Sequence, residues 1–290
     1  MCSNNKLNMR TFINWPGNKS KHISKFEKYL PEELFDDDNW SGTYIEPFIG
    51  SGAMLLYLEP EKWIINDLNK DLINVWKSVK ENPKKIITKF KSFGKKFKPL
   101  SKDKKIELCR KRTSKIEGME YTIDRATEYL LMKFCAYMGN ILLNNKFYFT
   151  SLNSNIYPNE SYTFLSDSTH NNLLDVSEFL NNTNGKIYNK DYKSVLRFVK
   201  KGDFVFLDPP YIENNKYQLN YNKNVDPSKE FVVELLKEMK KLDKIGAKWM
   251  MTQTNNKLIK DTFSKYKIKT FNVYRGFSGK TVKELLIMNY

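Results

Sequence analysis

The chain of 290 residues is long enough for one large domain, or for one domain that carries a smaller insert. Hydrophobic residues make up 40% of it, which favours a folded protein over a disordered one, and the net charge of +16 favours a polyanionic partner. Three widely spaced cysteines and two histidines give no disulfide framework and no metal-binding pattern, so we expect a reduced, intracellular protein without a metal. We expect no membrane partner, because no apolar run could span a bilayer and residues 1–10 lack the apolar stretch of a signal peptide.

The first part of the chain has the order of a βαβ unit. Residues 12–19 form a turn that carries an aromatic residue and a cation. Beyond it we expect strands over residues 43–48 and 62–67, and helices over residues 26–30, 53–58 and 72–79.

A glycine turn joins the first strand of this unit to its helix. Gly50 and Gly52 would let the backbone approach a ligand closely, although many tight turns carry glycine for packing alone. Asp67 ends the second strand, where an acid takes the ribose hydroxyls of a bound nucleotide. The alternative for Asp67 is a cap on a helix that begins at Leu68. Together these residues indicate an adenosine-containing cofactor, without saying which one.

Residues 77–183 lack strand alternation and predict an inserted helical domain. Within them, residues 77–115 hold 16 Lys and Arg against three Asp and Glu. A helix over residues 128–143 is expected from apolar residues at helical spacing, and a polar stretch over residues 144–172 follows. The concentrated charge favours nucleic acid as the partner, and a solvated pair of basic helices is the alternative.

The strand–helix rhythm resumes after this insert. We expect strands over residues 186–189, 203–207, 248–252, 269–274 and 285–290, and an amphipathic helix over residues 231–242. Because the last two strands are consecutive, they predict an antiparallel hairpin on an otherwise parallel α/β sheet.

The tetrad Asp208-Pro209-Pro210-Tyr211 follows an apolar strand, at the edge where open α/β sheets bind ligands. Its prolines remove two N–H groups, so a carboxylate and a backbone carbonyl could accept both protons of one amine. Such acceptors would stabilise positive charge as the amine attacks a methyl group. Tyr211 offers a face on which a flat base can stack. The alternative is a proline-rich turn with a local cap.

Six elements of the sequence occur in the order of a known family. They are Trp15-Pro-Gly17-Asn-Lys19, Glu46-Pro-Phe48-Ile-Gly50-Ser51-Gly52-Ala53, Asn66-Asp67-Leu-Asn69-Lys-Asp71-Leu72, Asp191-Tyr192, Asp208-Pro-Pro-Tyr211 and Glu284-Leu-Leu-Ile-Met-Asn289-Tyr290. Through them, over about residues 10–80 and 185–290, the chain resembles the Dam-type DNA adenine methyltransferases, the D12 class. Tyr221 and Phe231 also fall where that family carries Tyr and Phe.

The resemblance implies an S-adenosylmethionine-dependent enzyme that methylates N6 of adenine at a specific site in duplex DNA. It implies a Rossmann-like catalytic domain, here residues 1–76 and 184–290, with an inserted helical target-recognition domain, here residues 77–183. The catalytic residues would be Asp208, Pro209, Pro210 and Tyr211. The cofactor-binding residues would be Trp15, Gly17, Lys19, Glu46, Phe48, Gly50, Ser51, Gly52, Asp67, Asp191 and Tyr192. Our candidates for DNA binding are Lys95, Lys96, Lys98, Arg110, Arg112, Tyr217 and Tyr221.

Two departures from the family pattern concern specificity and the cofactor loop. The family's recognition segment is not found, and residues 147–158, its possible shortened remnant, contain no arginine. The target sequence therefore stays open, with Arg110, Arg112 or Arg125 as possible contacts to guanine. Asn18 replaces a family glycine, so the loop around it can differ.

Three other functions compete with DNA methylation. They are an RNA N6-adenine methyltransferase, a nucleic-acid-binding homologue without turnover, and a glutamine-protein methyltransferase, which would carry Asn in place of Asp208. Roles in restriction–modification, in epigenetic marking and in viral or phage self-protection are all compatible with the sequence. The oligomeric state, monomer or weak homodimer, does not follow from it.

Overall fold

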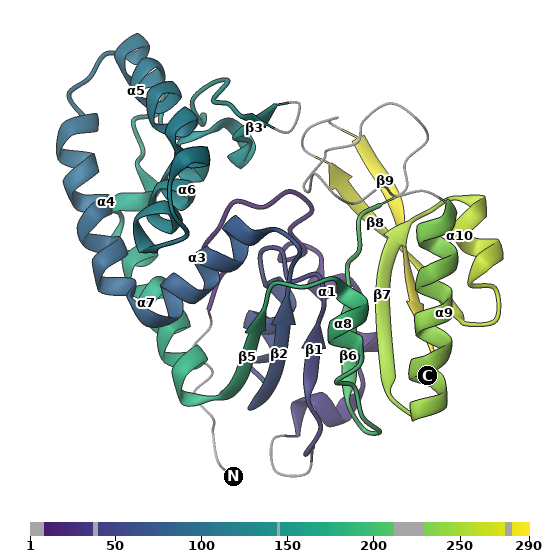
Figure 1. The fold of residues 1–290 in the computed structure, drawn as a ribbon. Helices are drawn as coiled ribbons and strands as arrows, with labels where there is room; N and C mark the ends of the chain where they lie inside the picture. The colour runs from purple at the N-terminus through teal and green to yellow at the C-terminus, as the bar shows by residue number, and fades with distance from the viewer. Residues whose placement is uncertain (1–8, 37–39, 144–145, 212–228, 276–279) are drawn as a thin grey trace. The chain divides into compact units, whose positions relative to one another are not determined.

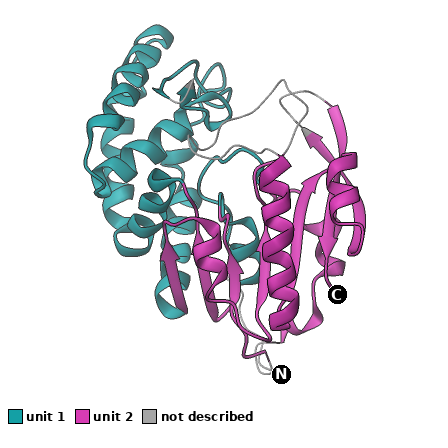
Figure 2. Cartoon of the chain, turned by 45° about the vertical axis from the view of Figure 1, so that its right-hand side comes forward, with its two compact units in different colours: residues 1–18, 50–59, 69–183 teal, residues 19–49, 60–68, 184–290 magenta. Residues whose placement is uncertain are grey.

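A computed structural model describes residues 9–36, 40–143, 146–211, 229–275 and 280–290. The chain forms two compact units (Figure 2). Unit 1 comprises residues 1–18, 50–59 and 69–183, and unit 2 comprises residues 19–49, 60–68 and 184–290.

Unit 2 contains one sheet, which has seven strands in the described part of the chain (Figure 1). In spatial order they are β5 (Asn184–Tyr188), β2 (Lys62–Asn66), β1 (Tyr44–Glu46), β6 (Phe204–Leu207), β7 (Lys248–Thr254), β9 (Lys280–Met288) and β8 (Lys267–Arg275). The first five strands are parallel, and β9 lies antiparallel between β7 and β8. This order confirms the predicted Rossmann-like α/β class with an antiparallel hairpin at its C-terminal end.

Helices cover both faces of the sheet, which explains why every residue of β6 is buried. The helices of unit 2 are α1 (Ile23–Phe26), α8 (Tyr192–Leu196), α9 (Lys229–Ile245) and α10 (Lys257–Thr262), with 3₁₀ turns over Glu27–Tyr29 and Glu32–Phe35. On one face α8 and α9 pack against Val205 and Leu207, and on the other Phe206 meets Phe26 of α1 at 6.3 Å between ring centroids. The helix expected over residues 26–30 is thus only a 3₁₀ turn that follows a short α1.

Unit 1 is mainly helical. Its helices are α2 (Ala53–Leu58), α3 (Lys70–Glu81), α4 (Pro83–Phe97), α5 (Lys102–Lys115), α6 (Ile123–Cys135) and α7 (Asp167–Asn182), with 3₁₀ turns over Ile116–Gly118, Tyr137–Gly139 and Thr163–Leu165. A small hairpin pairs β3 (Leu142–Leu143) with β4 (Lys146–Phe147). The predicted domain boundary at residue 77 falls inside α3, which contacts both α6 and α7. Which part of the chain recognises the target stays a prediction.

The helix expected over residues 128–143 is wrong beyond Cys135. Ala136 is extended and forms a bridge with Leu152, and Met138 and Gly139 have φ values of 51° and 69°. The apolar spacing continues beyond Cys135 because this segment stays partly buried. Its backbone, however, has non-helical dihedral angles, and Ala136 pairs with Leu152 instead of continuing the helix.

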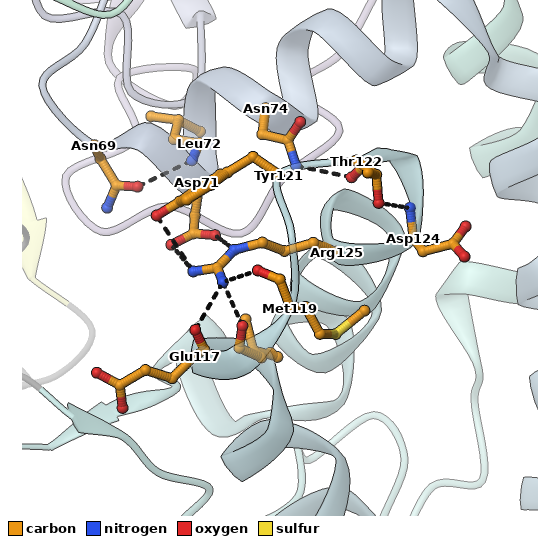
Figure 3. A network of polar contacts seen from close by, with 11 residues as sticks. Asn69, Asp71, Leu72, Asn74, Glu117, Met119, Tyr121, Thr122, Asp124 and Arg125 are labelled. Carbon is orange, nitrogen blue, oxygen red and sulfur yellow. Dashed lines mark hydrogen bonds and ion pairs between the residues drawn. The ribbon is translucent and has the colours of Figure 1, made fainter.

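A buried arginine joins α6 to α3 in unit 1 (Figure 3). Arg125 donates from Nε and Nη2 to the Asp71 carboxylate at 2.5 and 3.1 Å, and its side chain is 4% exposed. Nη1 donates to the carbonyls of Ile116, Glu117 and Met119. The suggestion that Arg125 contacts guanine is therefore wrong, because its donors are already bound inside the protein.

Candidate active site

The carboxylate of Asp208 is held from two sides in unit 2. Asp208 follows β6, and the parallel register that pairs Leu207 with Met251 brings it beside Thr252 of β7. Thr252 Oγ1 donates to Asp208 Oδ1 at 2.6 Å, and Lys19 Nζ donates to Oδ2 at 2.7 Å. Both carboxylate oxygens thus bind side chains that are distant in the chain, which favours a functional carboxylate over a local turn cap.

Tyr211 is fixed by a second carboxylate. Its hydroxyl donates to Oε2 of Glu284 at 2.8 Å, and Glu284 lies on β9, opposite Thr254 of β7. Burial, together with the charges of Asp208 and Glu284, raises the pKa of Tyr211 well above its usual value. The ring therefore stays a neutral phenol, which is suited to stacking.

The two prolines of the tetrad leave carbonyls for hydrogen bonding. Gln253 Nε2 donates to the Pro210 carbonyl at 3.4 Å, so this segment is tied to β7 next to Thr252. Asp208 has a side-chain exposure of 21%, enough for a small group to reach it.

Three residues of this site were not foreseen there. Lys19 was expected to contact the cofactor, but its ammonium lies on Asp208. Glu284 was part of the C-terminal element that resembles the family, but no role was assigned to it. Thr252 was distinguished only by its position at the end of an expected strand. Only the register between neighbouring strands, and the path of the loop that carries Lys19, could have indicated these contacts.

Three aromatic rings pack together in unit 2, and one of them carries a buried hydroxyl group. Phe48 and Tyr192 lie 5.2 Å apart between ring centroids, and Phe231 packs edge-on against Tyr192 at 5.8 Å. Tyr192 Oη is buried and has no hydrogen-bond partner among the described residues. Asp191 caps α8 by accepting from Lys193 N at 2.9 Å. A planar ligand with a polar edge would fit the chemistry of this group.

The segment after β2 is held by an asparagine. Asn66 Nδ2 donates to the Pro47 carbonyl at 3.0 Å and to the Lys190 carbonyl at 2.9 Å, which ties the segments that follow β1 and β5 to the end of β2. Asp67 comes next, and the N-cap of α3 is Asn69, whose Oδ1 accepts from Leu72 N at 2.9 Å. The alternative in which Asp67 caps this helix is therefore wrong.

Glu46, another predicted cofactor contact, is 3% exposed at the end of β1. Its Oε2 accepts a hydrogen bond from the Tyr44 hydroxyl at 2.7 Å. The Tyr44 hydroxyl thus orients the carboxylate of Glu46, which lies at the same edge of the sheet as Asp208.

The glycine turn and Trp15 lie together in unit 1. A Cβ atom at Gly50 would come within 3.0 Å of Trp15 Cδ1, and φ there is +47°, so this position requires glycine. Trp76 Nε1 donates to the Gly50 carbonyl at 3.3 Å. Asn18, which replaces the family glycine, closes its turn through N–H donation to the Trp15 carbonyl at 3.2 Å. The remaining candidates here, Gly17, Ser51 and Gly52, lie in these two turns.

Lys133 is buried against Trp15. Its Nζ donates to the Gly139 carbonyl at 2.8 Å and lies 4.8 Å from the centroid of the Trp15 ring. No salt bridge to Lys133 occurs among the described residues, and burial lowers its pKa from 10.5 to about 7.

This pKa predicts a pH-dependent stability. In the unfolded chain Lys133 keeps its proton up to its ordinary pKa of 10.5, whereas the folded protein releases it near pH 7. The free energy of unfolding should therefore rise between pH 7 and pH 10, and Lys133→Met should remove about 3–4 kcal/mol of that rise. Urea unfolding of both proteins at the two pH values measures it, since other titrating groups contribute equally to both. An identical rise in the two proteins would contradict the buried, neutral lysine.

The candidates for DNA binding differ in their exposure and in the contacts that they already make within the protein. Lys95, Lys96 and Lys98 are exposed near the end of α4. Arg110 is exposed, and its Nε donates to the Phe149 carbonyl at 3.4 Å. Arg112 binds both carboxylate oxygens of Glu128, at 2.6 and 2.5 Å. The other two candidates, Tyr217 and Tyr221, lie outside the described residues.

Two features are absent from the part of the chain that the structure describes. Among these residues, no group of three or more His, Cys, Asp or Glu could hold a metal ion. Among the helices that the structure describes, none combines the length and the apolar character needed to cross a bilayer.

Comparison with known proteins gives one consistent result. Residues 15–276 match the family model described as D12 class N6 adenine-specific DNA methyltransferase. The type II methyltransferase M.MjaIII of Methanocaldococcus jannaschii is 32% identical, over 98% of this chain and 100% of its own length. The type II methyltransferase M1.LlaDCHI of Lactococcus lactis subsp. cremoris is 27% identical, over 100% and 99%. A DNA adenine methylase of Vibrio cholerae is 27% identical over 47% of this chain and 45% of its own length.

Proposed function

Since the chain belongs to the D12 class of N6 adenine-specific DNA methyltransferases, we propose that it transfers a methyl group from S-adenosylmethionine to the N6 amine of adenine in duplex DNA. The observation that carries this chemistry is the Asp208 carboxylate, which Thr252 and Lys19 hold beside the half-buried phenol of Tyr211.

The tetrad suits an aromatic amine, whose lone pair is delocalised into the ring. Asp208 accepts a hydrogen bond from one N–H of the amine and a proline carbonyl accepts one from the other, while the base stacks on Tyr211. As the nitrogen attacks, it gains positive charge, which the carboxylate stabilises. The cofactor supplies an electrophilic methyl group on a sulfonium. To reach Asp208, the adenine must leave the base stack.

Unit 2 offers residues that fit the adenosine part of the cofactor. The buried, unpartnered Tyr192 Oη beside Phe48 suits the polar edge of an adenine ring. We assign the ribose hydroxyls to Asp67, after β2. The other cofactor residues proposed in unit 2 are Glu46 and Asp191, whereas Trp15, Gly17, Gly50, Ser51 and Gly52, which belong to unit 1, stay expectations from the resemblance.

We assign target recognition to residues 77–183. Their exposed lysines on α4 and α5 would contact phosphates, and Arg110 is our candidate for reading guanine, because Arg125 is bound to Asp71. Two relatives that match over 99% and 100% of their own length are named type II methyltransferases. We propose that this chain likewise modifies adenine within a short fixed site, as the methyltransferase of a restriction–modification pair does.

The phosphate contacts predict how DNA affinity depends on salt. The logarithm of affinity should fall linearly with the logarithm of salt concentration, by about 0.9 for each phosphate contact. Replacing Lys95, Lys96 and Lys98 with Glu should flatten this slope. As a matched control, Glu at Lys237, Lys240 and Lys244, exposed lysines of α9, changes the net charge equally and should leave the slope nearly unchanged. Equal slopes for both triple variants would show that the α4 lysines form a solvated face.

Methyl transfer to defined substrates tests the function directly. Tritiated S-adenosylmethionine is incubated with the protein and duplex DNA, single-stranded DNA or RNA, and the labelled nucleoside is identified. We expect N6-methyladenine in duplex DNA. Labelling confined to RNA would support the RNA methyltransferase instead, and labelling of none would favour a binding protein without turnover. Mapping N6-methyladenine in a host without adenine methylation then gives the site, and methylation without a shared motif would refute a fixed one.

A further inference from the structure

The ammonium of Lys19 lies on the catalytic carboxylate. Nζ is 2.7 Å from Asp208 Oδ2 and 4.9 Å from the centroid of the Tyr211 ring. The Lys19 side chain is only 6% exposed, so this position is part of the packed interior of unit 2. An N–H donor thus meets Asp208 while a positive charge faces Tyr211.

These are the two contacts that the proposed function assigns to the target base. Its amine would donate to Asp208, and its ring would stack on Tyr211. Lys19 therefore resembles the substrate in both respects, as a nitrogen donor and as a partner for the aromatic face.

The charge that develops during the reaction conflicts with a bound ammonium. When N6 attacks the methyl group, it becomes partly positive close to Asp208. An ammonium on the same carboxylate would repel that charge and neutralise the group that should stabilise it. Efficient transfer therefore requires that Lys19 leave Asp208 before the chemical step.

We propose that Lys19 is a placeholder for the target amine: its ammonium occupies Asp208 in the substrate-free enzyme, and the flipped adenine displaces it. This inference rests on the proposed function. The exchange replaces one hydrogen bond by another and transfers no atoms. It spares the enzyme an unpaired carboxylate at the reaction centre while no base is bound.

Binding of paired duplexes tests the exchange. One duplex carries adenine at the mapped target position and the other carries purine, which lacks the amine, and both are titrated with S-adenosylhomocysteine present. The wild type should bind them within about threefold, because the amine only replaces a contact already made. Lys19→Met should prefer adenine by about tenfold or more, because the amine then meets an unoccupied acceptor. As the control, Lys19→Arg keeps a cation on Asp208 and should retain the small ratio.

Two results would overturn the placeholder. One is a wild-type preference for the adenine duplex over the purine duplex of about tenfold or more, a result that does not depend on the folding of any variant. The other is a Lys19→Met variant whose adenine-to-purine preference equals that of the wild type. Methyl transfer by the same wild-type preparation to the adenine duplex separates the two levels of inference. Transfer together with either result refutes only the placeholder, whereas absence of transfer refutes the proposed function and the placeholder with it.

Discussion

Replacing Asp208 with alanine should lower the rate of methyl transfer about a hundredfold or more, because it removes the carboxylate that stabilises charge on the attacking amine. Cofactor binding should change much less, since the residues proposed to hold adenosine contact other parts of unit 2. Single-turnover transfer from tritiated cofactor measures the rate, and titration calorimetry measures the cofactor affinity.

The structure recommends a second variant beside alanine. Asp208→Ala leaves the buried Lys19 ammonium without its carboxylate, so part of its effect could come from lost stability. Asp208→Asn keeps the shape and an acceptor for Thr252 but removes the charge. Both variants should be inactive, and thermal unfolding should show that Asn preserves the fold better. Near-normal turnover by either one would contradict the assigned mechanism.

The parts of the site that the sequence predicts are those encoded locally. The tetrad after β6 and the acid after β2 each follow an apolar strand, so their place at the carboxyl edge of the sheet follows from strand order alone. The contacts of Lys19 with Asp208 and of Glu284 with Tyr211 join residues 189 and 73 positions apart. They depend on strand register and on a loop path, which no local pattern specifies.

In residues 77–183, the sequence likewise does not distinguish buried basic residues from exposed ones. Arg125 and the exposed Lys95 look alike in a basic sequence, yet one is a buried structural group and the other is solvated. What separates them is Asp71, which lies 54 positions away in the chain and looked like part of a family motif. A count of basic residues therefore predicts a partner for the whole segment, but not the role of each residue.

The second large effect concerns this buried pair. Arg125→Leu should lower the free energy of unfolding by about 3–5 kcal/mol, because it leaves the Asp71 carboxylate and three carbonyls without their donors. Arg112→Leu serves as the matched control, because it also breaks an Arg–carboxylate pair, with Glu128, but its side chain is 35% exposed. That variant should lose only about 1 kcal/mol. Urea unfolding followed by circular dichroism measures both.

The partner of Arg125 provides the decisive comparison. If most of the loss comes from stranding a buried charge, the double variant Arg125→Leu with Asp71→Leu should recover part of the stability, since neither charge is then left alone. Arg125→Lys should fall between the wild type and Arg125→Leu, because one ammonium cannot reach the carboxylate and all three carbonyls from the forked positions of a guanidinium (Figure 3). Equal losses for Arg125→Leu and Arg112→Leu would show that Arg125 is not a buried link between α3 and α6, and would return it to the candidates for contacting guanine.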